Sequence, residues 1–221
     1  MAALQFGVTL QAAGSPKDFH QLVRRADDLG YDVLAAPDHL GFLGPFSSLA
    51  SAAVLTERLR LRTYVLNASF WNAALLSREV ATVDLLSGGR VELGVGAGHM
   101  RSEYDDAGLP WRPLKERIQV LADLVLDVRR RLGDEEHTPR AVQRPVPVMI
   151  GAMSKDGLAL AAEHADIVGF AGLRQIEGEP PGNFTLASGA ETAERVEHVR
   201  RVAGGRSYRS DILLQAVLLG A

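Results

Sequence analysis

Short apolar segments alternate with longer segments of helical periodicity along almost the whole chain, and this alternation constrains the fold most. The expected strands are residues 5–10, 32–36, 59–66, 91–95, 147–150, 167–170 and 212–219. The expected helices lie between them, from Ser15 to Gly30 and at about 46–56, 72–86, 114–132, 155–164 and 191–203. Strands that are apolar on both faces and alternate with helices are typical of a parallel α/β sheet.

Two α/β architectures fit this alternation, an open doubly wound sheet and a closed TIM-type (β/α)8 barrel. Polar residues recur after several separate strands, at Asp38, His39, Asn67, His99 and residues 151–154. A site built from many strand-to-helix loops is how such barrels work, so the pattern favours the barrel. The sequence shows no domain boundary, and we expect residues 1–221 to form a single domain.

The number of expected strands falls one short of a complete barrel. Eight strands usually need about 250 residues, whereas this chain of 221 residues stops after the seventh expected strand. We therefore expect either a barrel truncated after that strand, with the C-terminal β/α unit missing, or a seven-stranded variant. An open edge at 212–219 would pair with another chain or aggregate unless it is covered, so we do not expect a well-behaved monomer. The insert at 173–188 is expected to be a loop over the site or a disordered excursion.

A glycine-rich strand end at residues 94–99 is the most informative short motif. Gly94, Gly96 and Gly98 alternate, which removes side chains from one face and lets a flat ligand or another backbone come close. A glycine-rich turn with no ligand is the alternative. The dinucleotide-binding fingerprint requires glycine at position 99, where this chain has His99.

Composition limits the compartment and the partners. The net charge of −3 favours neither a nucleic acid nor an anionic membrane as the main partner. The chain contains no cysteine, no apparent signal peptide and no long apolar run, so we expect a cytoplasmic protein without a membrane span. No set of His, Asp and Glu has the spacing of metal ligands, and no serine lies in a nucleophile elbow, so we expect no metal site and no serine hydrolase.

Several motifs together resemble the luciferase-like flavin monooxygenase superfamily, in particular its branch that uses the deazaflavin coenzyme F420. The runs that carry the resemblance are ADDLGYD at 26–32, Asp38-His39, REVATVDLLSGGR at 78–90 and VMIGA at 148–152. The resemblance implies a TIM-type barrel with an isoalloxazine-like ring at the C-terminal mouth of the strands. It implies an F420-dependent oxidoreductase that transfers a hydride between the coenzyme and a small organic substrate. It also implies a homodimer, for which the expected helices at 46–56 and 72–86 are the candidate surface.

Three other functions remain open at this point. The first is an FMN-dependent luciferase-like monooxygenase. The second is a non-catalytic flavin-binding protein, because the missing eighth strand resembles a shortened flavoprotein offshoot of the same superfamily. The third is a hydrolase barrel that uses carboxylates such as Asp38 and Glu103.

The resemblance also implies roles for individual residues. Asp38 and His39 match the polar pair beside the ring and are the expected catalytic residues. Tyr64-Val65 matches a non-proline cis peptide in a bulge behind the ring, and residues 151–154 match a loop whose N–H groups receive the coenzyme phosphate. The expected coenzyme-binding set is Asp38, Tyr64, Val65, Asn67, Gly96, Gly98, His99, Gly151, Ala152, Met153 and Ser154. Some deazaflavin sugar-phosphate dehydrogenases have a glutamate acid where this chain has His99, so their specific chemistry is not transferred.

Each expected site residue also has a purely structural interpretation. His39 is either an acid/base or hydrogen-bond donor at the ring edge or a cap for the following helix. Asp38 either contacts the coenzyme or makes an Asx turn. His99 either contacts the ring or substrate or caps a helix. Four aromatic residues in expected mouth loops form either cavity walls or core packing, namely Phe42, Phe46, Phe70 and Trp71.

Overall fold

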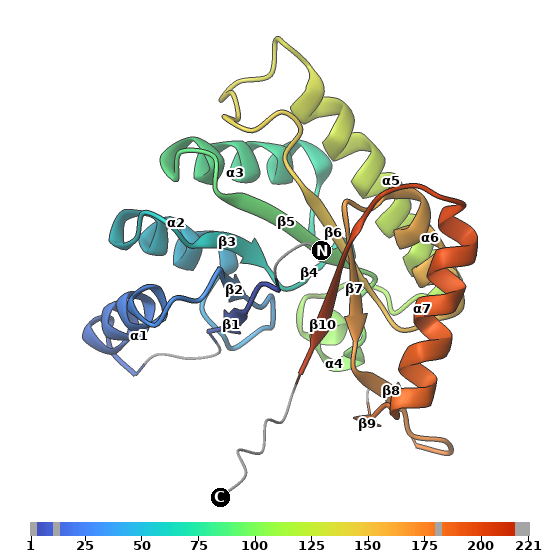
Figure 1. Cartoon of the computed structure of the whole chain (residues 1–221). Coiled ribbons are helices and arrows are strands. Elements are labelled where there is room, and N and C mark those ends of the chain that lie inside the picture. Colours follow the sequence, from blue (N-terminus) through green and yellow to red (C-terminus); the bar gives the residue numbers. More distant parts are fainter. Residues whose placement is uncertain (1–3, 11–13, 180–182, 215–221) are drawn as a thin grey trace, which may run out of the picture.

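The computed structural model describes residues 4–10, 14–179 and 183–214. Its main sheet is parallel and follows the order β1-β2-β3-β5-β6-β7-β10, with the short strand β4 paired to β5 (Figure 1). The strands are β1 (Gly7–Thr9), β2 (Val33–Ala36), β3 (Arg60–Thr63), β4 (Leu66–Asn67), β5 (Val91–Gly96), β6 (Val148–Ala152), β7 (Ile167–Ala171) and β10 (Arg209–Leu213). The sheet curves into a partial barrel, which confirms the expected α/β fold class.

Helices cover the outer face of this sheet (Figure 1). They are α1 (Pro16–Asp28), α2 (Pro45–Leu55), α3 (Ala73–Leu86), α4 (Arg101–Asp106), α5 (Leu114–Gly133), α6 (Lys155–His164) and α7 (Gly189–Ala203). Local signals set their starts, because Ser15 caps α1 ahead of a proline and Ser188 forms a capping box with Glu191. The short helix α4 was not expected from the sequence. No helix in the described ranges is long and apolar enough to cross a membrane.

The last strand differs from the expectation. We expected residues 212–219, whereas β10 spans Arg209–Leu213, and residues 215–221 lie outside the described ranges. The reason is that Arg209 and Asp211 alternate along β10 toward the barrel interior, where Arg209 binds Glu92 at 2.7 Å and Asp211 binds Arg62. Ion pairs to the buried side chains of Glu92 and Arg62 therefore extend the strand to residues that precede the expected apolar run. Within the described ranges, β1 and β10 are the two ends of the strand path.

The expected strand at 59–66 is interrupted. The structure has β3 and β4 instead, separated by Tyr64 and Val65, whose peptide bond is cis as the resemblance implied. Gly94 faces this interruption, and a Cβ atom on Gly94 would lie 1.9 Å from the carbonyl oxygen of Thr63. The strand β5 therefore needs glycine at this position because the neighbouring backbone occupies the space of a side chain.

The insert at 173–188 contains regular structure that was not expected. Leu173–Gln175 (β8) and Phe184–Leu186 (β9) pair as an antiparallel hairpin at the lower end of the molecule (Figure 1). Pairing satisfies the backbone N–H and C=O groups of these short segments, which a loop would have to leave to solvent. Residues 180–182 lie outside the described ranges.

The run at 78–90, the most specific part of the resemblance, connects separate segments of the fold through side-chain hydrogen bonds. The buried carboxylate of Asp84 accepts hydrogen bonds from the backbone N–H groups of Val142 and Gln143, at 2.8 and 2.9 Å. Arg90 donates to the carbonyl oxygens of Ala53 and Thr56, which satisfies the C-terminal end of α2.

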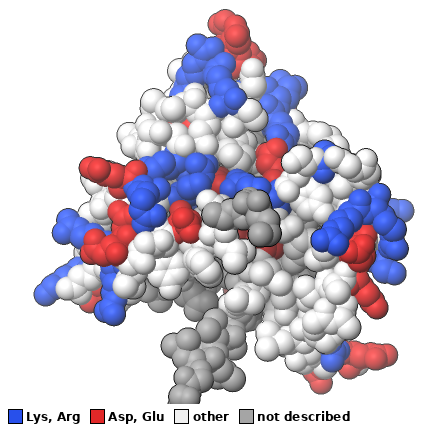
Figure 2. All heavy atoms as spheres, viewed as in Figure 1, with Lys and Arg blue, Asp and Glu red and all other residues white. Residues whose placement is uncertain are grey.

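Acidic and basic side chains are intermixed over the visible face of the molecule (Figure 2).

Candidate functional site

A cavity of about 760 Å³ lies at the C-terminal ends of the parallel strands. The expected catalytic and coenzyme-binding residues, which come from four separate segments, all line it. They are Asp38, His39, Tyr64, Val65, Asn67, Gly96, Gly98, His99, Gly151, Ala152, Met153 and Ser154. The position of these residues agrees with the usual place of sites in β/α barrels.

Val65 forms the inner part of the cavity, and two glycines make room for its side chain. A Cβ atom on Gly96 would lie 2.9 Å from Cγ2 of Val65, and one on Gly151 would lie 3.1 Å from its Cγ1. The sequence left open whether a flat ligand or another backbone segment lies against the glycine strand. In the structure it is another segment of this chain, the one that carries Val65. At these two positions no side chain projects from β5 or β6, which leaves an apolar surface around Val65 against which a flat ring could lie.

Gly98 is required for a different reason. Its φ of +71° is in the left-handed region, and a Cβ atom would lie 2.5 Å from both Oδ1 of Asn67 and the hydroxyl oxygen of Tyr104. The Tyr104 hydroxyl donates to Oδ1 of Asn67 at 3.0 Å, and the backbone N–H of Ser69 donates to the same oxygen at 3.2 Å. Because its oxygen is engaged in this way, Asn67 has its amide NH₂ group to offer a ligand.

Asp38 is held by residues of the following strand and loop. Its Oδ2 accepts hydrogen bonds from the backbone N–H of Asn67 at 3.2 Å and from Nε1 of Trp71 at 2.9 Å. Burial raises the pKa of this carboxyl group, although the two hydrogen bonds oppose the shift. The interpretation of Asp38 as part of an Asx turn is therefore wrong, because its hydrogen bonds come from a segment about thirty positions away rather than from the adjacent turn.

The aromatic lining of the cavity differs from the expectation. Trp71 packs edge-on against Phe46, with ring centroids 5.2 Å apart, and holds Asp38 rather than facing the cavity. The residues expected as walls, Phe42, Phe46, Phe70 and Trp71, are not among those that line the cavity. The aromatic side chains that do line it are Tyr64, Trp111 and Phe184, besides the two histidines. Trp111 was not expected because it follows helix α4, and Phe184 was not expected because it lies in the insert. Neither residue comes directly after a strand of the main sheet, which was the signal used to predict the site.

His39 forms an ion-pair geometry with a residue that follows β5. Its Nδ1 lies 2.8 Å from Oε1 of Glu103, and the same carboxylate oxygen accepts from the backbone N–H of Leu40 at 3.1 Å. Both residues line the cavity, and the imidazole is the more exposed of the two, since the side chain of His39 is 31% exposed and that of Glu103 is 9% exposed. Helix α2 begins after Gly44, so the capping interpretation of His39 is wrong.

His99 packs against both His39 and the hairpin. Its ring is edge-on to that of His39, with centroids 5.5 Å apart, and edge-on to that of Phe184, with centroids 5.4 Å apart. Partial enclosure lowers the pKa of His99, and the neighbouring His39 and Arg117 add to this effect. Met100 is the N-cap residue of α4, so the capping interpretation of His99 is wrong.

Arg117, on α5, was not expected and holds the loop that carries His99. It donates to the carbonyl oxygens of Ala97 at 3.2 Å and of Gly98, and its guanidinium lies 3.9 Å above the Trp111 ring. Burial lowers the pKa of Arg117. Its position three residues after Leu114 and four before Leu121 places it on the inward face of the helix, which is the signal in the sequence that could have found it.

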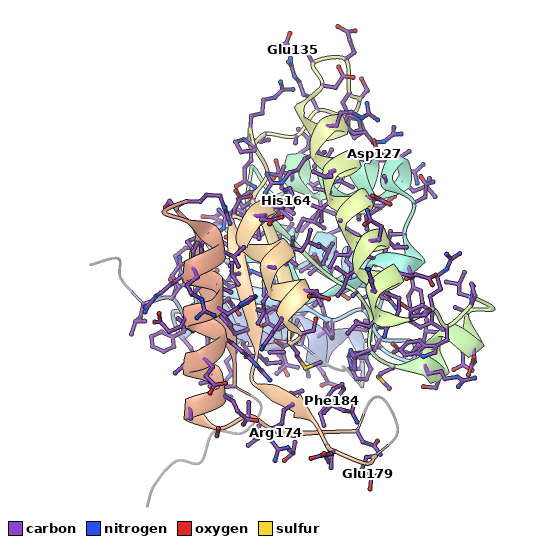
Figure 3. All side chains as sticks on the ribbon, turned by 90° about the vertical axis from the view of Figure 1, so that its right-hand side faces the viewer. Asp127, Glu135, His164, Arg174, Glu179 and Phe184 are labelled. Atoms are coloured by element: carbon purple, nitrogen blue, oxygen red, sulfur yellow. The ribbon has the colours of Figure 1, made fainter. Side chains whose placement is uncertain are left out.

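A helix N-terminus and basic side chains also contribute to the cavity. Ser154 caps α6 by accepting from the backbone N–H of Gly157 at 3.2 Å, and residues 151–154 line the cavity just before this helix. Arg174 and Arg195 also line it, from the hairpin and from α7. Figure 3 shows Arg174, Phe184 and Glu179 together at the lower end of the molecule. No cluster of three or more potential metal ligands occurs in the described ranges.

Comparison with known proteins identifies similar chains over almost this whole length. The model of the luciferase-like monooxygenase family matches residues 1–209. The chain is 31% identical over 216 residues to an F420-dependent glucose-6-phosphate dehydrogenase of Amycolatopsis mediterranei, covering 84% of this chain and 63% of that protein. It is 27% identical over 193 residues to a 5,10-methylenetetrahydromethanopterin reductase of Archaeoglobus fulgidus, covering 83% of this chain and 56% of that protein.

A solved structure shows the same fold. The coenzyme F420 dependent tetrahydromethanopterin reductase from Methanopyrus kandleri superposes with a TM-score of 0.77 at 20% identity, covering 96% of this chain and 65% of that chain. This chain thus spans less than two thirds of the length of each of these proteins.

Proposed function

We propose a function from the premise that the chain belongs to the luciferase-like monooxygenase family. The proposal is an F420-dependent oxidoreductase that transfers a hydride between the deazaflavin coenzyme and a small organic substrate. The observation that carries it is that the residues matching the family's coenzyme site line one cavity of about 760 Å³. The choice of coenzyme class is supported by the relative named as an F420-dependent glucose-6-phosphate dehydrogenase and by the solved structure named as a coenzyme F420 dependent tetrahydromethanopterin reductase.

The residues of the cavity fit a flat ring with a phosphate-bearing tail. The cavity volume of about 760 Å³ is within the usual range for cofactor sites. The ring would lie against Val65 and the glycine faces of β5 and β6, with Asn67 and Asp38 at its polar edge. The phosphate would be received at the N-terminus of α6 by residues 151–154, because backbone N–H groups and the helix dipole favour an anion there. When bound, the coenzyme would supply the two-electron chemistry.

The remaining residues of the cavity would position the substrate and move its proton. His39 is the imidazole that Glu103 orients toward the cavity, and it is the proposed acid or base for the substrate. His99, Phe184 and Trp111 offer a largely aromatic wall that would exclude water from the reacting atoms.

Equilibrium titration of the purified protein with F420 and with FMN tests the coenzyme proposal. We expect tighter binding of F420, because the site residues match the deazaflavin branch. Tighter binding of FMN would contradict the proposal and favour the monooxygenase alternative. Turnover is then tested by the consumption of reduced F420 with a panel of enones, imines and ketones, and by the reduction of F420 with alcohols. Binding without turnover on the whole panel would favour a non-catalytic flavin-binding protein.

We also propose that the protein forms a homodimer through α2 and α3, the helices at the left of Figure 1. Large apolar side chains are exposed on these two helices, at Val54, Leu75, Leu85 and Leu86. Light scattering at micromolar concentration tests this proposal, with Val54→Glu as the disrupting variant. A monomeric wild-type protein would contradict it.

A further inference from the structure

Glu103 contributes one buried carboxylate oxygen to two N–H donors. Oε1 lies 2.8 Å from Nδ1 of His39 and accepts from the backbone N–H of Leu40 at 3.1 Å. An ionised carboxylate only accepts hydrogen bonds. A hydrogen bond at 2.8 Å therefore requires the proton to be on Nδ1 of the imidazole, which leaves Nε2 of a neutral ring as the acceptor.

The ring of His39 is also fixed in its orientation. Two aromatic rings contact it edge-on, Phe42 with centroids 5.6 Å apart and His99 with centroids 5.5 Å apart. A flip of the imidazole would exchange Nδ1 for a carbon atom at Glu103 and lose the hydrogen bond. The contacts thus hold one ring nitrogen at Glu103 and turn the opposite edge of the ring, which carries Nε2, away from this carboxylate.

We infer that Glu103 is a positioning residue that fixes the Nδ1–H tautomer of His39 and makes Nε2 the proton acceptor of the resting site. Glu103 also lines the cavity, but the inferred role is exerted through His39 and does not require Glu103 itself to contact substrate or coenzyme. The role of His39 in turnover rests on the proposed function, whereas its tautomer is a property of the protein alone.

The alternative is that Glu103 only ties down the loop after β2 through Leu40. Both interpretations predict damage when the carboxylate is removed, so activity alone does not separate them. A direct observation of the tautomer does, because a loop tie has no preference for either ring nitrogen of His39.

The primary experiment is ¹⁵N NMR of the histidine side chains in the coenzyme-free protein, with His39→Asn used to assign the His39 signals. We expect neutral His39 in the wild type to carry its proton on Nδ1. Observation of a neutral ring protonated on Nε2 would overturn the inference without any variant of Glu103. Because no coenzyme is present, this result does not depend on whether the protein uses F420.

Two variants of Glu103 then test whether its hydrogen-bond acceptor, rather than its negative charge, fixes the tautomer of His39. Glu103→Gln keeps an oxygen acceptor of the same shape, so we expect it to retain the Nδ1–H tautomer. Glu103→Met fills the space without an acceptor, so we expect it to lose that preference. His99→Gln is the matched control, since it removes a ring contact but no hydrogen bond of His39, and it should keep the tautomer. An unchanged tautomer in a folded Glu103→Met would overturn the inference.

Steady-state kinetics supply a second test. We expect Glu103→Met to lower kcat by about 100-fold, the usual size of an acid–base contribution, with the KM for substrate changed by less than about threefold. Glu103→Gln should restore most of kcat. A rise in KM without a fall in kcat would indicate a loop tie and contradict the positioning role. Absence of F420 turnover in the wild type would remove the proposed function and leave the NMR test standing.

Discussion

The Tyr64 hydroxyl donates a hydrogen bond of 2.8 Å to Oδ1 of Asp211, and this bond ties the bulge behind the cavity to the last described strand. Arg62, two residues earlier, binds the other oxygen of the same carboxylate. Both burial and the neighbouring carboxylate raise the pKa of Tyr64, so its hydroxyl remains a donor. The position of Tyr64 and Val65 in the cavity therefore depends on a contact across the barrel interior.

Tyr64→Phe tests this dependence. The variant removes one hydrogen bond to a carboxylate, so we expect the free energy of unfolding to fall by about 1–3 kcal/mol. We also expect coenzyme affinity to fall, because Tyr64 lines the cavity and is no longer anchored. Urea unfolding and coenzyme titration measure the two effects. Unchanged values for both would mean that the Tyr64–Asp211 bond does not position the bulge.

The buried carboxylate of Glu92 predicts a pH-dependent stability. Burial would raise its pKa, but Arg62, Arg209 and Arg60 outweigh burial and lower it. Because the pKa of Glu92 is lower in the folded state, its ionised carboxylate stabilises the protein above the ordinary pKa near 4.3. This stabilisation is lost as the pH falls through the lower pKa of the folded state.

We therefore expect Glu92→Gln to lose about 3–5 kcal/mol at pH 7, the usual cost of removing one partner of a buried ion pair. The difference from the wild type should begin to shrink below about pH 4, where the carboxylate of the unfolded chain takes up a proton, and should be lost as the pH falls through the lowered pKa of the folded state. Urea unfolding across this pH range measures the difference. Glu163→Gln is the surface control, with an expected change within about 0.5 kcal/mol. A difference that does not change with pH would contradict the role of the charge.

Gly98→Ala should be strongly destabilising. Gly98 and Gly108 have similar φ values of +71° and +67°, but only at Gly98 would a Cβ atom meet other groups, Asn67 and Tyr104 at 2.5 Å. We expect Gly108→Ala to cost about 1–2 kcal/mol from backbone strain alone. Gly98→Ala should cost more and should also weaken coenzyme binding. Equal costs in urea unfolding would show that the contact with Asn67 relaxes freely.

Asp38→Asn should stabilise the protein at neutral pH. Burial raises the folded pKa of Asp38, so the folded state binds more protons than the unfolded state just above pH 4, and stability falls as the pH rises through that window. An asparagine carbonyl can still accept from Trp71 without a buried charge. We expect a higher melting temperature at pH 7 together with weaker coenzyme binding. A lower melting temperature would show that the carboxylate charge stabilises the fold.

His39→Ala should affect turnover more than coenzyme binding. If His39 is the acid or base, removing it should lower kcat by about 100-fold or more. The Kd for the coenzyme should change much less. Stopped-flow turnover and equilibrium titration measure the two quantities. Equal losses in both would make His39 a binding residue, and no loss in either would exclude a catalytic role.

Local pattern in the sequence predicted most of the parallel architecture. The alternation of apolar strands and amphipathic helices depends on side-chain periodicity, which acts over a few residues, and the observed elements β2, β5, β6, α3 and α6 match it closely. The sequence also predicted where the cavity lies, because residues that follow parallel strands meet at one edge of the sheet. The cis bond at Tyr64 came from the family resemblance rather than from any periodicity.

The partners of the site residues depended on the tertiary structure. Glu103 lies 64 positions from His39 and Tyr64 lies 147 positions from Asp211, and no local pattern encodes such pairs. The same reason explains the wrong start of the last strand, since Arg209 and Asp211 are polar in sequence but pair with the buried side chains of Glu92 and Arg62. The sequence by itself determined most of the strands and helices of the main sheet and its outer layer, because these depend on local periodicity. Only the folded chain decided which charges neutralise one another, because a buried charge is tolerated only where a distant segment supplies its partner.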